Sequence, residues 1–148
     1  MNKIDLKEVN EARGAVARND FKRMDEHAER YYEEIRKRKS DVAAISENTG
    51  FSVEDVEIIK QHIFITEHDL GDEVFERFST SYDMAVSWQR LIDGKNIQEM
   101  DIVLLNHELM ELNLMAQGYN YKSAHNITEQ KYNYIKYIKE LDTREGVF

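Results

Sequence analysis

The sequence predicts an all-α protein, a compact bundle of about five or six helices with a long N-terminal amphipathic helix. Three observations support this prediction. The 148 residues include no proline, the residue that most strongly interrupts a helix. Apolar residues recur at steps of three and four, and no stretch shows sustained apolar–polar alternation bounded by turn dipeptides. Capping residues and glycines stand where helices are expected to begin and end.

The first helix is expected over residues 4–39 because one face carries apolar residues at helical spacing. Its basic residues at 36–39 complement the dipole of a last turn. His27 falls on the charged face and is expected in solvent. We expect residues 1–39 to form an arm beside a compact domain at 40–148, and the 4–35 helix to offer a surface for a homo-oligomer. The stripe comprises Val9, Ala12, Val16, Phe21, Met24, Ala28, Tyr31 and Ile35.

Five shorter helices are expected in the compact region, each starting at a residue that can cap it. Glycines at 50, 94 and 118 end three of them, since glycine readily adopts the left-handed conformation found at helix C-termini. Residues 65–80 are less regular and are expected to form a loop. The expected starts are Ser40 or Asp41, Ser52, Ser81, Asn96 and Ser123.

Composition excludes several functional classes. The formal net charge of −9 argues against nonspecific DNA binding and against adhesion to an anionic membrane. The absence of cysteine excludes disulfides, thiolate zinc sites and cysteine nucleophiles. No apolar run approaches the roughly 18 residues that span a bilayer, and the first residues lack the apolar segment of a signal peptide. We therefore expect a cytoplasmic protein without a membrane partner.

The helix expected over residues 97–115 carries the clearest candidate site. His107 and Glu111 interrupt its apolar stripe one turn apart, so both side chains point in the same direction. A charged carboxylate on a core-facing stripe must be paired or protonated. The structural alternative is an ion pair made for architecture alone, within this pair or with Arg90 or Lys122.

Two chemistries fit this pair. The segment His107-Glu108-x-x-Glu111 is similar to the His-Glu-x-x-His zinc motif, although its second ligand is glutamate. By that analogy His107 and Glu111 bind zinc or manganese, and Glu108 is the base. The third ligand is His125 or His62. The Glu-x-x-His pairs of di-iron bundles do not occur. In the metal-free alternative, histidines act as acid and base. These are His62, His68, His107 and His125.

A second motif has the spacing of a helix-turn-helix. Ser46, Gly50 and Val56 match the small residue, turn glycine and packing residue of that corner. A DNA reader also needs basic or amide side chains at the start of its second helix. Glu54 and Asp55 stand there and would repel phosphate. The motif therefore indicates a structural corner, with a DNA-binding regulator as the weaker alternative.

An unusual order of short segments extends over about residues 40–130. The segments are His62-Ile63-Phe64, His68-Asp69-Leu70, Phe78, the Ala85–Leu91 run with Trp88 and Arg90, Asp101 to His107-Glu108, and Ala124-His125. This order resembles a small helical domain at the C-termini of bacterial polymorphic toxins and of some phage head-morphogenesis-type proteins. The toxin setting implies a hydrolase, with nucleic acid among its targets, and an immunity protein as partner. The phage setting implies a structural or packaging role with a phage partner.

The leading hypothesis is a His/Glu-dependent hydrolase, nuclease-like or metal-dependent. Its side chains must converge within about 10 Å, as catalytic groups do. Arg90 would stabilise an anion, while His107, Glu111 and His125 are the expected metal ligands. The rival hypothesis is a non-catalytic phage-associated structural or interaction protein. The expected catalytic residues are His62, His68, Arg90, His107, Glu108 and His125.

Overall fold

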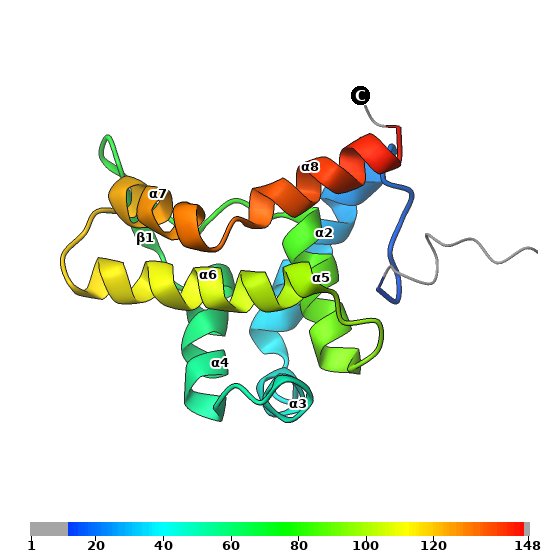
Figure 1. Cartoon of the computed structure of the whole chain (residues 1–148), viewed down its shortest axis with the longest axis horizontal. Helices are drawn as coiled ribbons and strands as arrows, with labels where there is room; N and C mark the ends of the chain where they lie inside the picture. The colour runs from blue at the N-terminus through cyan, green and yellow to red at the C-terminus, as the bar shows by residue number, and fades with distance from the viewer. Residues whose placement is uncertain (1–11, 147–148) are drawn as a thin grey trace, which may run out of the picture.

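The computed structural model describes residues 12–146, which hold seven α-helices, one π-helical turn and a two-stranded sheet. The prediction of a mostly helical protein is confirmed, whereas the predicted helix count is wrong. None of these helices is both long enough and apolar enough to cross a lipid bilayer. In chain order (Figure 1), the elements are α2 (Phe21–Lys37), α3 (Asp41–Thr49), α4 (Val53–Lys60), η1 (Gln61–Ile65), β1 (His68–Gly71), β2 (Val74–Glu76), α5 (Tyr82–Asp93), α6 (Glu99–Ala116), α7 (Tyr121–Lys131) and α8 (Tyr134–Arg144).

The long helix predicted over residues 4–39 is wrong in its described N-terminal part, and residues 4–11 lie outside the described residues. The α2 helix begins only at Phe21, where the side chain of Asp20 accepts a hydrogen bond from the backbone N–H of Arg23 at 3.2 Å. Residues 12–20 form turns, and Gly14 has a φ of +84°. A left-handed glycine and an N-capping aspartate therefore outweigh the apolar spacing.

The apolar face of α2 packs within the chain. Met24 and Ala28 contact α5 residues, and Tyr31 and Ile35 belong to the main core. The described part of the predicted arm therefore shares its core with residues 40–146. This buried part of the stripe is not available for self-association.

The corner between α3 and α4 has the form that its sequence predicts. Gly50 ends α3 with a φ of +83°, and the Ser52 hydroxyl caps α4 by accepting from the N–H of Asp55 at 3.1 Å. Ile45 and Val56 are fully buried on the inner side of the corner. These contacts show how the turn supports the core.

The loop predicted over residues 65–80 is wrong in part, because β1 and β2 pair there as an antiparallel hairpin. Asp72 and Glu73 lie at its tip with φ of +54° and +64°, the backbone that a two-residue hairpin turn requires. The strands have only four and three residues, too few for an alternating pattern to be read from the sequence.

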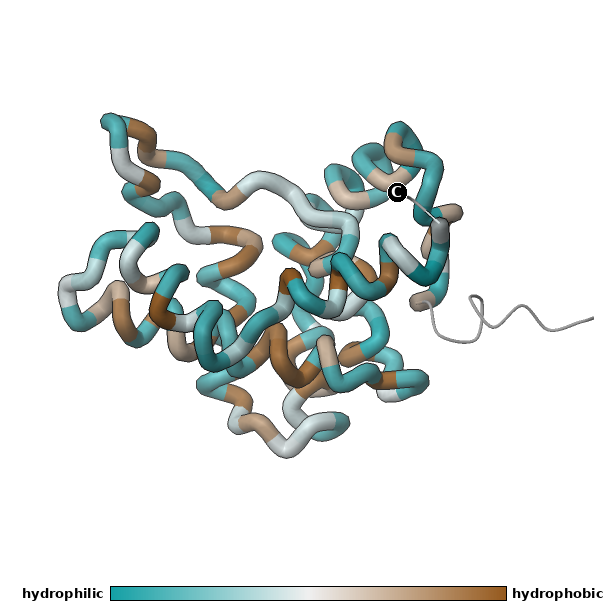
Figure 2. The backbone as a smooth tube through the Cα atoms, turned by 45° about the horizontal axis from the view of Figure 1, so that its top comes forward, coloured by the Kyte–Doolittle hydropathy of each residue, from teal (hydrophilic) through white to brown (hydrophobic). Residues whose placement is uncertain are grey.

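The main core lies where α2, η1 and α5 meet. Tyr32, Phe64 and Trp88 make successive edge-to-face ring contacts, with centroids 4.6 and 5.1 Å apart. Hydrophobic and hydrophilic residues alternate along the helices in Figure 2, as expected for helices with one buried face. Ser81 and Gly94 bound α5 as predicted.

The last predicted helix is divided into two. Asn120 caps α7, and Asn133 caps α8 by accepting from the N–H of Lys136 at 3.0 Å. Both helices lie along one side of α6, while α3 and α4 lie on its other side in Figure 1. The break at Tyr132 and Asn133 leaves a backbone carbonyl that the candidate site uses.

Candidate functional site

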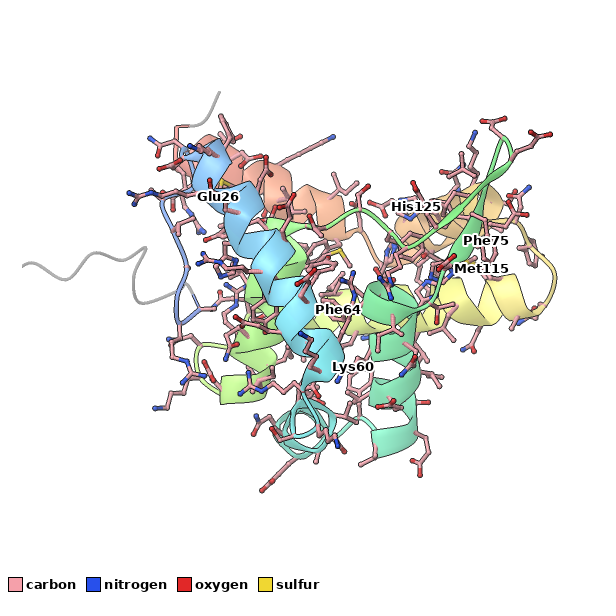
Figure 3. The ribbon with its side chains drawn as sticks, turned by 180° about the vertical axis from the view of Figure 1, so that it is seen from behind. Glu26, Lys60, Phe64, Phe75, Met115 and His125 are labelled. Atoms are coloured by element: carbon pink, nitrogen blue, oxygen red, sulfur yellow. The ribbon has the colours of Figure 1, made fainter. Side chains whose placement is uncertain are left out.

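The candidate site lies where η1 and α7 approach the middle of α6. The π-helical turn supplies His62, and π-helical turns occur frequently at functional sites. One face of α6 supplies His107 and Glu111, together with Glu108. The α7 helix supplies His125, which Figure 3 places beside the hairpin. The structure thus brings together five of the sequence-predicted residues.

Glu111 lies at the centre of this cluster, with its side chain 2% exposed. Its Oε1 lies 2.9 Å from Nε2 of His62, and its Oε2 lies 2.8 Å from Nδ1 of His125. The same Oε2 lies 3.3 Å from Nε2 of His107. Burial alone would raise the pKa of Glu111, but hydrogen bonds from the three histidines hold this pKa well below its usual value. Glu111 is therefore an ionised carboxylate.

His107 faces an acceptor with each ring nitrogen. Its Nδ1 donates to the carbonyl oxygen of Tyr132 at 2.8 Å, and its Nε2 faces Glu111. Burial would lower the pKa of His107, but the hydrogen bond to Glu111 and the charge of Glu108 raise this pKa to about 9. The Tyr132 carbonyl holds a proton on Nδ1, which leaves Nε2 as the nitrogen available to a metal.

Glu108 faces the same cluster from the next position of α6. Its side chain is 7% exposed, and its Oε2 lies 3.5 Å from Nε2 of His62 without a hydrogen-bond partner. Burial, followed by the charge of Glu111, raises the pKa of Glu108 to about 7. A carboxylate in this environment is suited to proton transfer near neutral pH or to cation binding.

Glu129 is a member of the cluster that sequence analysis missed. Its Oε2 lies 3.5 Å from Nδ1 of His107 and 3.6 Å from Nε2 of His125, and it has no hydrogen-bond partner. A signal was present, because His125 and Glu129 stand four residues apart, as His107 and Glu111 do. Two packed helices that each carry a His-x3-Glu spacing can present four potential metal ligands, two histidines and two glutamates, to the space between them.

His68 supports the cluster from the hairpin. Its Nε2 donates to the backbone carbonyl of His62 at 2.8 Å, and burial lowers the pKa of His68. Its ring stacks on Phe78, with centroids 4.2 Å apart, and Phe78 contacts Tyr121 at 5.1 Å. His68 therefore positions His62, and sequence analysis missed the aromatic wall that these rings form.

Arg90 has its described contacts away from the histidines. Its guanidinium donates to the two carboxylate oxygens of Asp101 at 2.8 and 2.7 Å, and both side chains are buried between α5 and α6. Asp101 precedes His107 by six residues, or about 9 Å along a helix axis. The structure does not bring Arg90 into the cluster, and the sequence-predicted role of Arg90 as an anion stabiliser gains no support from these contacts.

The donor atoms of the cluster fit a divalent cation. Within residues 12–146, two groups each place one ligand atom per residue within 4.8 Å of the others: His62, Glu108 and Glu111, and His107, His125 and Glu129. Zinc bonds to histidine nitrogen and carboxylate oxygen imply ligand-to-ligand distances of about 3.3 Å in a tetrahedron. The distances from His62 Nε2 to its two carboxylate oxygens, 2.9 and 3.5 Å, lie on either side of that value.

Comparisons of the chain with protein-family models, with curated proteins and with solved structures found no significant match. The function is therefore inferred from the geometry and chemistry of the cluster.

Proposed function

We propose that this chain is a hydrolase that depends on a divalent cation. The observation that carries the proposal is the convergence of His62, His107 and His125, from three separate elements, on the buried carboxylate of Glu111. Imidazole and carboxylate are ligands suited to zinc and manganese.

A purely structural role does not account for this cluster of buried charged side chains. Placing charged groups in a protein interior costs several kcal/mol per ion before pairing, and apolar residues of similar volume are often as stable. Pairing is incomplete here, because buried oxygens of Glu108 and Glu129 lack hydrogen-bond partners. A bound cation would satisfy such an oxygen, which favours a binding site over a structural ion pair.

The cluster combines a buried interior with a more open side. The side chains of His125 and Glu129 are 30% and 22% exposed, so the α7 side of the cluster borders solvent. A divalent cation supplies Lewis acidity toward a carbonyl or phosphoryl oxygen and acidifies water. The zinc-motif analogy assigns Glu108 as the base, and its raised pKa is compatible with that prediction.

The resemblance to phage- and toxin-associated domains favours a macromolecular substrate, including nucleic acid. The net charge of −9 opposes broad contact with phosphates. Lys122 and Lys131 are exposed on α7, the helix that carries His125, and they are the local cations nearest in sequence to the open side. A nuclease would therefore use a short phosphate contact along α7, together with the bound cation.

Activity of the reconstituted protein tests the proposal. Chelator-treated protein is supplied with Zn²⁺ or Mn²⁺ and assayed on bis(p-nitrophenyl) phosphate, p-nitrophenyl acetate, labelled casein and single-stranded RNA. We expect cation-dependent turnover of at least one probe. Glu111→Gln should lower that turnover by about 100-fold or more, because it removes the ionised centre of the ligand set.

Glu140→Gln is the matched control, since Glu140 is exposed on α8 and the same change of charge should leave turnover unchanged. Circular dichroism of each variant establishes that it is folded. Turnover that survives in Glu111→Gln, or a cation-loaded protein that hydrolyses none of the four probes, would contradict the proposal.

A further inference from the structure

We propose that the cluster binds two divalent cations that share Glu111 as a bridging carboxylate. This inference rests on the proposed function for its catalytic meaning, but it is stated and tested as a binding property. We call the ion near His62 and Glu108 the inner cation, and the ion near His107, His125 and Glu129 the outer cation.

The two oxygens of Glu111 face different sets of ligands. Oε1 lies 2.9 Å from Nε2 of His62, on the inner side. Oε2 lies 2.8 Å from Nδ1 of His125 and 3.3 Å from Nε2 of His107, on the outer side. A carboxylate with one oxygen toward each set has the arrangement that bridges two metals, which in two-metal hydrolytic sites lie about 3.5–4 Å apart.

Each side also has its own unsatisfied carboxylate oxygen. Among the described residues, four buried side-chain polar atoms lack a hydrogen-bond partner, and two of them are Oε2 of Glu108 and Oε2 of Glu129. Glu108 belongs to the inner group and Glu129 to the outer group. Glu129 Oε2 lies near Nδ1 of His107 and Nε2 of His125, the ring nitrogens that do not face Glu111, so the Glu129 carboxylate has to turn toward Nε2 of His107 to join the outer cation. A buried carboxylate oxygen without a hydrogen bond is costly, and the nearest histidine nitrogens lie 3.5–3.6 Å from these two oxygens, so each oxygen points to a missing ligand.

The charges of the cluster agree with two cations. Glu108, Glu111 and Glu129 bring three carboxylates together, of which Glu108 and Glu111 are buried and Glu129 is partly exposed. Two divalent cations would bring four positive charges to these three carboxylates, with histidine nitrogens among their ligands.

The two positions differ in their access to solvent. All three inner residues are buried, whereas the outer group includes His125 and Glu129, which are partly exposed. The inner cation should therefore exchange slowly, and the outer cation should exchange readily and face the substrate. In this arrangement Glu108 binds the inner cation, and this ligand role replaces the role of base that the zinc-motif analogy gives it.

Metal stoichiometry tests the inference. Chelator-treated protein is titrated with Zn²⁺ by calorimetry, and bound metal is counted by mass spectrometry after dialysis. We expect two equivalents in the unchanged protein and in the control Glu140→Gln. Glu108→Gln and Glu129→Gln should each retain one equivalent, because each removes a ligand from a different side.

A separate measurement tests whether the Glu111 carboxylate bridges the two cations. Two Mn²⁺ ions joined by a carboxylate are magnetically coupled, so their electron paramagnetic resonance spectrum shows hyperfine lines at half the spacing of isolated Mn²⁺. The inference would be overturned by one bound equivalent in the unchanged protein, or by two equivalents that give the spectrum of isolated ions. Neither outcome depends on a variant that could fold poorly. Two coupled cations without hydrolysis would reject only the proposed function, and one cation with hydrolysis would reject only the second site.

Discussion

Replacing Glu111 by glutamine is expected to destabilise the metal-free protein strongly. The carboxylate lies within hydrogen-bonding distance of three imidazoles, at 2.8, 2.9 and 3.3 Å. An amide has only one acceptor oxygen, and its NH₂ group faces ring nitrogens that donate to the carboxylate. Glutamine also removes the negative charge that keeps His107 protonated in a buried position.

The magnitude follows from these contacts. Hydrogen bonds to charged groups contribute about 1.5–3 kcal/mol each, and breaking a buried ion pair by removing one partner costs about 3–5 kcal/mol. Because His62 can change tautomer and accept from the amide, we expect a loss of about 3 kcal/mol in the free energy of unfolding. For a chain of this size that loss lowers the melting temperature by about 6–12 °C.

Urea denaturation at pH 7 with chelator present measures this loss. The matched comparison is Glu129→Gln, whose carboxylate is 22% exposed and makes longer contacts, so its loss should be below about 1 kcal/mol. If Glu111→Gln costs less than about 1 kcal/mol, Glu111 is not the ionised centre of the cluster, and the reasoning about the three histidines is wrong.

Three further predictions concern residues outside the cluster. His27, predicted to lie in solvent, instead packs against the rings of Tyr31 and Tyr82, and burial lowers its pKa. The unfolded chain therefore takes up a proton below about pH 6.5 that the folded chain resists, so stability falls as the pH is lowered through this range. His27→Phe should therefore lose less stability between pH 6.5 and pH 5 than the unchanged protein in urea titrations, and an equal loss would refute this assignment. Arg90→Met leaves the buried carboxylate of Asp101 without its cation and should cost about 3–5 kcal/mol in urea, while folded protein keeps its zinc stoichiometry. Loss of zinc from that folded variant would show that Arg90 acts on the cluster. Gly94→Ala should cost about 1–3 kcal/mol, because a Cβ at φ +67° would lie 2.8 Å from the Asn48 side chain. A thermal melt unchanged by this substitution would contradict the close approach.

The sequence predicted the parts of the fold that local signals determine. Ser81 and Gly94 bound α5 because a hydroxyl cap and a left-handed glycine act within one turn of the helix. No comparable signal marks the break between α7 and α8, where neither proline nor glycine stands at Tyr132 or Asn133. There the carbonyl of Tyr132 accepts from His107, 25 residues earlier, so a tertiary contact accompanies the break.

The residues of the candidate site likewise divide into those that local sequence signals predict and those that depend on tertiary packing. Helical periodicity alone singled out His107 and Glu111 as polar residues on a buried face. Their meeting with His62 depends on a π-helical turn, whose register the apolar spacing does not reveal. Glu129 was overlooked because only the packing of α7 against α6 gives its spacing from His125 a meaning. The pairing of Arg90 with Asp101 likewise depends on how α5 and α6 cross.

The carbonyl of Tyr132 also sets the order in which the cluster can be completed during synthesis. A growing chain emerges from its N-terminal side, so His62 and the α6 residues leave the ribosome well before α7. Until about residue 132 has emerged, Glu111 lacks His125, and His107 lacks the acceptor that orients its ring. A nascent chain therefore carries an unfinished cluster until α7 has emerged and docked on α6. If the cluster binds cations and is hydrolytic, both properties can arise only after that step.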